Sequence, residues 1–426
     1  MANEHEQIRQ RQLRKRQEQR RAREQKKLQR RKLLMMIGAA ALVVGLCCLV
    51  VALVRHANTP EPEAVTIETQ PSTAPQEPQT VITLAFGGDL NVTDKTVAAG
   101  ATGEGYDYTD VFMDVVPALA GADAAVLDLE GNICGSPSGS TGTRAPLELA
   151  TALRSAGVDM IQMANSSALN NGLIGLTDTL ESLRAVGLEP VGAFASDEEY
   201  ERQKGFTLRS INGVKVAFVS FTKGMDDLGL PAGGENRVNL LYTDYTSTYQ
   251  DVDTEGITAV LDAVALEEPD ITVALLHWGS EYNDQISDSQ KRIAKLMLDN
   301  GVDAIVGTHS HYVQKLEYDP LAGTVVAWSL GDFLGDGERA GTAYSIILEL
   351  EITRDNQTGT ARITDVGYTP IYTVSSNVEG DDTMKSLRIE PAIAAYEANS
   401  IDKVPTEVYT AMKSALSKIQ ARIPEE

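Results

Sequence analysis

Three histidines in this sequence have the side-chain type and position to bind a metal ion. His277 directly follows the apolar run ITVALL, and His309 and His311 come just after the apolar run DAIVG. Each apolar run has the length and composition of a buried strand, so the imidazoles lie at strand ends. An H-x-H pair brings two imidazoles close enough to share one metal ion. Together with carboxylates, these ligands suit Zn, Mn or Fe.

Two carboxylates and an amide occupy equivalent positions. Asp89 follows the strand-like run VITLAF and two glycines, Glu130 follows AAVLDL, and Asn165 follows DMIQMA. Carboxyl ends of strands form the ligand-binding edge of open α/β sheets, so these side chains should converge with the histidines. Taken singly, His277 is typical of a hydrogen-bonded core residue and Asp89 of a turn. Their joint placement predicts a divalent metal site, whose ligands are Asp89, Glu130, His277, His309 and His311.

The elements that position these side chains show one repeated pattern. A helix-like stretch ends in glycine and is followed by a β-prone run, as in LRSAGVDMIQMA (153–164) and LDNGVDAIVGT (298–308). The glycine suits the left-handed position just past a helix end. This alternation predicts an α/β fold with helices outside the sheets. Residues 343–375 are typical of antiparallel strands that close a second sheet, and residues 390–422 return to helix.

The N-terminal region predicts a membrane anchor. Residues 33–54 contain 22 residues without a charge, a length that as a helix spans about 33 Å and crosses a bilayer. A cleaved signal peptide is the rival interpretation, but its apolar region should be shorter and end at small residues. The basic residues that precede the span keep the N-terminus in the cytoplasm. The rest of the chain is then extracellular, at a single-pass position in the cell membrane.

Charge is divided unequally along the chain. The formal net charge is −23, but residues 1–54 hold 13 Lys and Arg against 4 Asp and Glu. The remaining 372 residues therefore carry 24 basic and 56 acidic side chains, a net charge of −32. A body this acidic excludes nucleic acid as its partner, because phosphate contacts require clustered Lys and Arg.

These boundaries predict five regions. They are a basic cytoplasmic arm (1–32), a transmembrane signal anchor (33–54), a Pro/Thr/Glu-rich tether (55–80), a main domain (81–375) and a C-terminal helical segment (376–426).

Several motifs of the main domain resemble the CapA family of bacterial capsule-synthesis proteins. They are GGD (87–89), LEG (129–131), RAP (144–146), HWGSEY (277–282), GTHSHYVQ (307–314) and SLGDF (329–333). The resemblance covers roughly residues 81–340. It implies a metallophosphatase-like layered sandwich of β-sheets flanked by helices, in a protein associated with poly-γ-glutamate capsules. It also places Asp89, Glu130 and the three histidines on probable metal positions.

The resemblance extends to substrate binding, with one departure. Arg144 lies in a segment that could meet an anionic substrate group, and Asn165 lies within a second family motif (164–172). That motif usually contains an Asn-His pair, where this chain has Ser166 and Ser167. In metallophosphatases the Asn ligates a metal and the His acts as an acid or electrostatic stabiliser. A serine hydroxyl replaces neither role well, so the catalytic residues remain unassigned.

Two functions follow. The first is a metal-dependent hydrolase or transferase, anchored by one membrane helix, that acts on poly-γ-glutamate or a related anionic envelope polymer. The second is a non-catalytic family member that binds the polymer or assembles with other membrane proteins of capsule synthesis. The retained histidines favour the first function, and the missing Asn-His pair favours the second. A serine hydrolase is disfavoured, because Ser166 and Ser167 lack an evident base.

Overall fold

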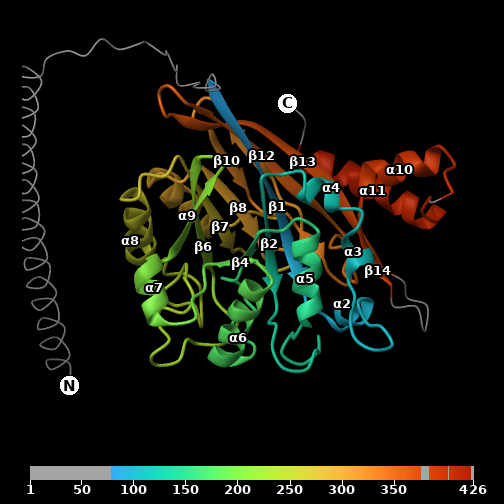
Figure 1. Ribbon diagram of the computed structural model, residues 1–426, viewed down its shortest axis with the longest axis horizontal. Coiled ribbons are helices and arrows are strands. Elements are labelled where there is room, and N and C mark those ends of the chain that lie inside the picture. Colours follow the sequence, from blue (N-terminus) through green and yellow to red (C-terminus); the bar gives the residue numbers. More distant parts are fainter. Residues whose placement is uncertain (1–77, 376–382, 402, 424–426) are drawn as a thin grey trace, which may run out of the picture. The chain divides into compact units, whose positions relative to one another are not determined.

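A computed structural model describes residues 78–375, 383–401 and 403–423 (Figure 1). The predicted cytoplasmic arm, the transmembrane anchor at 33–54 and most of the tether lie outside these residues. Among the helices that the structure describes, none has the length and apolar character needed to cross a bilayer.

The described chain folds around two β-sheets (Figure 1). Sheet 1 has eight strands, in the spatial order β14 (Met384–Arg388), β13 (Ala361–Ser375), β12 (Tyr344–Asp355), β1 (Gln79–Asn91), β2 (Ala124–Glu130), β3 (Met160–Gln162) and β4 (Glu189–Val191), with β11 (Asp332–Leu334) pairing beside the end of β1. Sheet 2 has six strands, in the order β5 (Phe206–Ile211), β6 (Val214–Thr222), β7 (Ile271–His277), β8 (Ala304–Thr308), β10 (Thr324–Ala327) and β9 (Leu316–Asp319).

Helices complete the outer layers. They are α2 (Asp94–Ala99), α3 (Thr109–Phe112), α4 (Val116–Leu119), α5 (Leu147–Ser155), α6 (Gly172–Ala185), α7 (Asp197–Gln203), α8 (Thr254–Ala265), α9 (Asp288–Asp299), α10 (Ile389–Glu397) and α11 (Thr406–Arg422). The expected left-handed glycines are confirmed after three of them, at Gly157 (φ 104°), Gly187 (φ 85°) and Gly301 (φ 86°). Each lets the chain leave its helix and enter the next strand at no steric cost.

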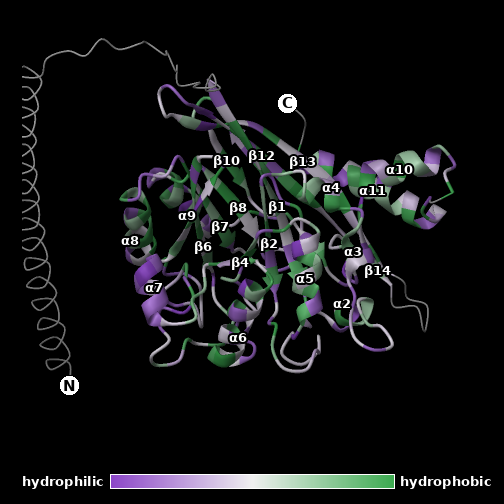
Figure 2. Cartoon of the chain, viewed as in Figure 1, coloured by the Kyte–Doolittle hydropathy of each residue, from purple (hydrophilic) through white to green (hydrophobic). Residues whose placement is uncertain are grey.

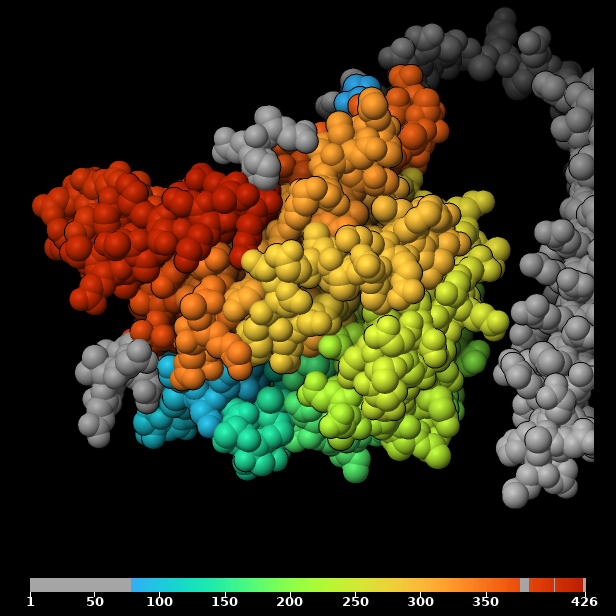
Figure 3. Space-filling model, turned by 180° about the vertical axis from the view of Figure 1, so that it is seen from behind, coloured from blue at the N-terminus to red at the C-terminus, as the bar shows by residue number. Residues whose placement is uncertain are grey.

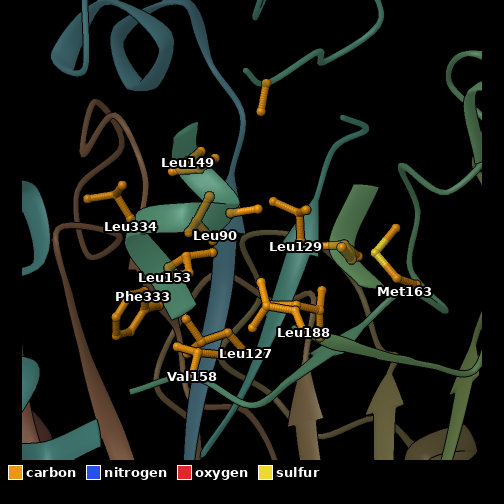
Figure 4. Packing of buried hydrophobic residues seen from close by; sticks show 14 of the residues in the cluster. Leu90, Leu127, Leu129, Leu149, Leu153, Val158, Met163, Leu188, Phe333 and Leu334 are labelled. Atoms are coloured by element: carbon orange, nitrogen blue, oxygen red, sulfur yellow. The ribbon is translucent and has the colours of Figure 1, made fainter. Parts of the chain in front are cut away.

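Sheet 1 is buried on both faces. Side chains alternate between the two faces of a strand, so neighbouring apolar residues of β1 and β2 belong to different cores. On one face, Leu90, Leu127 and Leu129 pack against Leu149 and Leu153 of α5 (Figure 4). This cluster joins the helices α5 and α6 to the sheet.

The opposite face of sheet 1 packs on sheet 2. Ile82 and Phe86 of β1 share a buried cluster with Phe218 of β6 and Val273 of β7. On the far face of sheet 2, residues such as Leu276 pack against α8 and α9. The layers are therefore helix, sheet, sheet and helix, and the expected layered sandwich flanked by helices is confirmed. Hydropathy follows these layers, with hydrophobic strands inside and a hydrophilic α7 at the surface (Figure 2).

The C-terminal third differs from the expectation in one respect. Residues 344–375 do form antiparallel strands, but β12 pairs with β1 and so extends sheet 1 instead of closing a second sheet. Within the predicted helical segment, β14 adds a further antiparallel strand to β13. Helix α11 buries Met412, Ala415 and Ile419 in the core between the sheets. The α10–α11 hairpin projects from the body beyond this contact (Figure 3).

Candidate metal centre

The candidate site lies where the carboxyl ends of strands from both sheets meet. Strands β1 and β2 run parallel in sheet 1, as do β7 and β8 in sheet 2. Asp89, Glu130 and His277 are among the last residues of these strands, slightly earlier than the predicted positions just past them. Contacts between residues of the two sheets, such as His277 with Asp128, show that the two sheet edges face each other.

A carboxylate from sheet 1 orients His277. The Nδ1 atom of His277 lies 2.8 Å from Oδ2 of Asp128, and the Thr308 hydroxyl donates to the same oxygen at 2.8 Å. The ring is fully buried, and its Nε2 atom has no hydrogen-bond partner in the described part of the chain. A carboxylate bonded to one ring nitrogen fixes the ring and leaves the other nitrogen for a metal ion.

His311 is held in the same way by Asp332. Its Nδ1 atom lies 2.7 Å from Oδ1 of Asp332, a residue of β11 that is in register with Asp89 of β1. Burial alone would lower the pKa of His311, but the hydrogen bond to Asp332 and nearby carboxylates raise that pKa to about 10. In the metal-free protein this ring carries a proton that a metal ion would have to displace.

His309 is anchored through its backbone. Its N–H group donates to both oxygens of Asp89, at 3.0 and 3.1 Å. The ring is 2% exposed, and neither of its nitrogens has a hydrogen-bond partner among residues that the structure describes. Burial, followed by the charges of His277 and other nearby groups, lowers the pKa of His309 well below its usual range. A neutral, unpartnered imidazole costs stability in a buried position unless a ligand occupies it.

The predicted ligands form two groups that share one carboxylate. Glu130, His277 and His309 form the first group, and Asp89, Glu130 and His311 form the second, with the ligand atoms of each group within 4.8 Å of one another. One oxygen of Glu130 is buried without a described partner. Burial and the neighbouring Glu130 raise the pKa of Asp89 well above its usual range. A cation between these groups would pair with both carboxylates and with the unpartnered ring nitrogens, so the residues fit a divalent metal.

Backbone strain is concentrated around this site. His309, His311 and Tyr282 have φ angles of 86°, 59° and 52°, in the left-handed region that few residues other than glycine adopt. Such conformations cost free energy and cluster where a side chain must be aimed at a ligand. Two of these residues, His309 and His311, are proposed ligands, and the third, Tyr282, stacks its ring against His311.

The serines that depart from the family pattern contact the site directly. The Ser166 hydroxyl donates to Oε2 of Glu130 at 2.5 Å, and Ser167 is buried beside it. Asn165 is fully engaged elsewhere, because its amide nitrogen donates to Asp128 and its oxygen accepts from the Ser167 N–H. Asn165 therefore braces the ends of β2 and β3 in this structure. Substrate binding by Asn165 stays a prediction.

Arg144 pairs through its backbone with Asn132, just past the end of β2. Its side chain passes the Cα of Gly135, where an added Cβ would lie 3.7 Å from the arginine Cδ. Its buried Nε has no hydrogen-bond partner within the described chain. The neighbouring Thr143 does line the cleft beside the site. Substrate binding by Arg144 stays a prediction.

A cleft opens beside the candidate ligands. One cavity of about 430 Å³ is bordered by Glu130, Ser167 and Thr143. A second, of about 140 Å³, is bordered by His311 and Asp332, and both cavities share Asn91. The two cavities therefore adjoin each other beside the candidate ligands.

The orienting carboxylates were not predicted from the sequence. Asp128 lies two residues before Glu130 in the run LDLE, and Asp332 lies in the motif SLGDF. A charged residue inside an otherwise apolar strand was the available signal, because such residues are seldom fully buried unless paired.

The fold and the site define a two-sheet α/β sandwich with a candidate metal centre between the strand ends. Residues 83–337 match the family model described as bacterial capsule synthesis protein PGA_cap, and the chain belongs to this family. It is 31% identical over 211 residues to "Capsule biosynthesis protein CapA" of Bacillus anthracis, a match that covers 50% of this chain and 48% of that protein. It is 30% identical over 207 residues to "PGA biosynthesis protein CapA" of Bacillus subtilis (strain 168), covering 49% of this chain and 50% of that protein. The chain spans about half the length of the curated relatives it matches.

Solved structures with a similar arrangement include two phosphoesterases. One is a phosphatase of Mycoplasma pneumoniae, with a TM-score of 0.42 and 14% identity, covering 69% of this chain and 94% of that one. The other is the calcineurin-like phosphoesterase YfkN of Bacillus subtilis, with a TM-score of 0.39 and 15% identity, covering 80% of this chain and 100% of that one.

Proposed function

We propose that this protein is a metal-dependent hydrolase or transferase that acts on an anionic cell-envelope polymer during capsule synthesis. The observation that carries the proposal is the sharing of Glu130 by two groups of buried ligands, each completed by imidazole. Asp89, Glu130, His277, His309 and His311 would hold the divalent metal, with Mn, Zn or Fe suited to these donors. A bound metal would polarise the scissile group and lower the pKa of a water molecule.

The chain's own residues prepare this chemistry. Asp128 and Asp332 fix the rings of His277 and His311, so little reorganisation is needed when a ligand arrives. Burial of the ligand side chains lowers the local dielectric constant, which strengthens electrostatic interactions between them. The cleft beside Glu130 and Ser167 gives a polymer a path past the ligands.

Poly-γ-glutamate or a related envelope polymer is the proposed substrate, because the matched relatives are described as capsule or PGA biosynthesis proteins. Other membrane proteins of capsule synthesis are the proposed partners. The test uses the full-length chain in non-ionic detergent, loaded in turn with Mn²⁺, Zn²⁺ and Fe²⁺ and incubated with poly-γ-glutamate and with a phosphodiester. We expect cleavage of the substrate, seen as new polymer chain ends or as released alcohol, only when metal is present. A chelator or the Asp89→Asn substitution should abolish this cleavage. Metal binding without product from either substrate would contradict the catalytic proposal.

A non-catalytic role is the second candidate, and Ser166 is the observation that favours it. Its hydroxyl, in the position of the family's metal-binding Asn, donates to Glu130 at 2.5 Å. Ser167, in the position of the family's His, cannot supply a proton near neutral pH as an imidazole would. In this role the metal centre would bind the polymer without turnover. The same incubation separates the two roles, because binding would then persist with no release of chain ends.

We propose that residues 33–54 anchor the protein in the cell membrane, with the N-terminus in the cytoplasm and the acidic domain extracellular. The uncharged stretch and its preceding basic residues support this topology. A protease added to intact cells should release the domain by cutting within residues 57–80. The extracellular location would be contradicted if the domain stayed intact on whole cells and the protease cut it only after the cells were permeabilised.

A further inference from the structure

An arginine lies against the aromatic ring that packs on one of the candidate metal ligands. The Tyr282 and His311 rings are stacked, with centroids 4.8 Å apart and planes 21° from parallel. The guanidinium carbon of Arg339 lies over the same tyrosine ring, 3.9 Å from its centroid. This distance is well within the range of a cation–π interaction, which restricts the arginine without neutralising it.

Arg339 and Tyr282 line a cavity next to the candidate metal centre. Both border the cavity of about 140 Å³ that is also lined by His311, Asp332 and Asn91. That volume equals the share of roughly four or five water molecules, enough for one carboxylate or phosphate group. A group bound there would lie beside a candidate metal ligand. The rest of its molecule could extend into the larger cavity next to Glu130.

The charge of Arg339 is available for a ligand. Besides His311, Arg339 and Lys95 are the basic residues that line these cavities, and Lys95 forms an ion pair with Glu338 at 3.2 Å. Within the described ranges, no carboxylate pairs with Arg339, whose one observed charged or aromatic contact is the Tyr282 ring. A guanidinium presents donors in a planar fork that matches the two oxygens of a carboxylate or phosphate. Acidic residues such as Asp336 line the same cavity, so an anion needs such a partner to enter.

We infer that Arg339 binds an oxyanion, a carboxylate or a phosphate, of the molecule that occupies the candidate metal centre. This inference rests on the proposed function, since it names the chemistry that the same site selects. It also explains how a chain whose residues 55–426 carry a net charge of −32 accepts a polyanion. One positioned guanidinium and the metal offset the repulsive field locally. Arg339 is then a specificity-determining residue, and Tyr282 is the residue that positions it.

The test measures anion affinity by isothermal titration of the full-length chain in non-ionic detergent, with inorganic phosphate and with glutarate as probes. Each titration is run without metal and with Mn²⁺. We expect Arg339→Ala to weaken binding of the preferred probe about 10- to 100-fold, the effect of losing charge-assisted hydrogen bonds. The affinity of Arg339→Lys should lie between those of the wild type and Arg339→Ala, because an ammonium keeps the charge but lacks the planar fork. The stronger of the two probes identifies the carboxylate or the phosphate as the recognised group.

Matched variants separate recognition from general charge and folding effects. Arg362→Ala removes an exposed arginine of β13 and should bind both probes as the wild type does. Tyr282→Phe keeps the ring and should retain affinity, whereas Tyr282→Leu should lose it. Equal affinities in Arg339→Ala and Arg362→Ala, or no anion binding by the wild type, would overturn the inference. Metal content measured on the same samples tests the proposed function separately, because Arg339→Ala should bind as much metal as the wild type.

Discussion

Replacing His309 by alanine should remove most of the stabilisation that a divalent metal gives to the protein. Loss of a residue that only orients a ligand already costs about 10- to 100-fold in metal affinity, so loss of a ligand should cost at least about 100-fold. At a metal concentration 100 times the wild-type Kd, the wild type gains about 2.7 kcal/mol in its free energy of unfolding. The variant, with a 100-fold weaker Kd, gains about 0.4 kcal/mol under the same conditions.

The metal-free variant should behave quite differently. In the wild type the His309 ring is buried with two unpartnered nitrogens. Removing this ring relieves a desolvation penalty but leaves a small cavity. These two effects oppose each other, and the metal-free stabilities of variant and wild type should be close. A purely structural histidine would show the reverse, with a large loss in the absence of metal and none specific to its presence.

Thermal unfolding of the full-length chain in non-ionic detergent, with and without Mn²⁺ or Zn²⁺, measures both quantities. Ser310→Ala is the matched control, since Ser310 is buried in the same loop and, among the described residues, its hydroxyl bonds to the backbone of Tyr312 alone. It should keep the metal-dependent shift. An equal metal-dependent shift in His309→Ala and Ser310→Ala would remove His309 from the ligand set.

The sequence was sufficient to predict which side chains meet, because their positions depend on a local rule. Asp89, Glu130, His277, His309 and His311 each follow an apolar run, and parallel strands bring their carboxyl ends to one edge. Parallel neighbours, such as β1 with β2 and β7 with β8, therefore place their ligands at the same edge of each sheet. The helix, glycine and strand alternation predicted the layers for a similar reason, since each unit is specified by its own residues.

The sequence did not predict features that depend on pairing between distant segments. Strand β12 has the alternation of an antiparallel strand, but nothing in its residues indicates that its partner is β1, more than 250 residues earlier. The contact of Asp128 with His277 also joins two sheets, over 149 residues of sequence. Hydrophobic periodicity specifies the element and its buried face, whereas the partner is selected by packing of the complete core.

Gly88 illustrates the same limit at a single residue. In the sequence, the pair Gly87-Gly88 before Asp89 is typical of a turn, yet both residues lie inside β1 at a shift of its register with β2. A Cβ on Gly88 would lie 1.8 Å from the carbonyl oxygen of Gly331. That oxygen accepts a hydrogen bond from the Asp89 N–H at 3.1 Å, so the close approach of the two chains positions a candidate metal ligand.

Gly88→Ala should consequently destabilise the protein by more than about 4 kcal/mol, a loss seen only where core packing or backbone geometry is broken. The atom that a new methyl group would meet belongs to the backbone of a buried strand connection, which cannot move aside as a flexible side chain can. Gly103→Ala is the control, because an added Cβ there meets nothing within 4 Å, and its effect should stay within about 0.5 kcal/mol. Thermal unfolding of both variants in non-ionic detergent, with the yield of folded protein, measures the difference.

If Gly88→Ala unfolded at the same temperature as Gly103→Ala, β1 and the segment at Gly331 could not approach as closely as the structure has them. The positions of Asp89 and Asp332 in the metal centre would then need revision, since both depend on that approach.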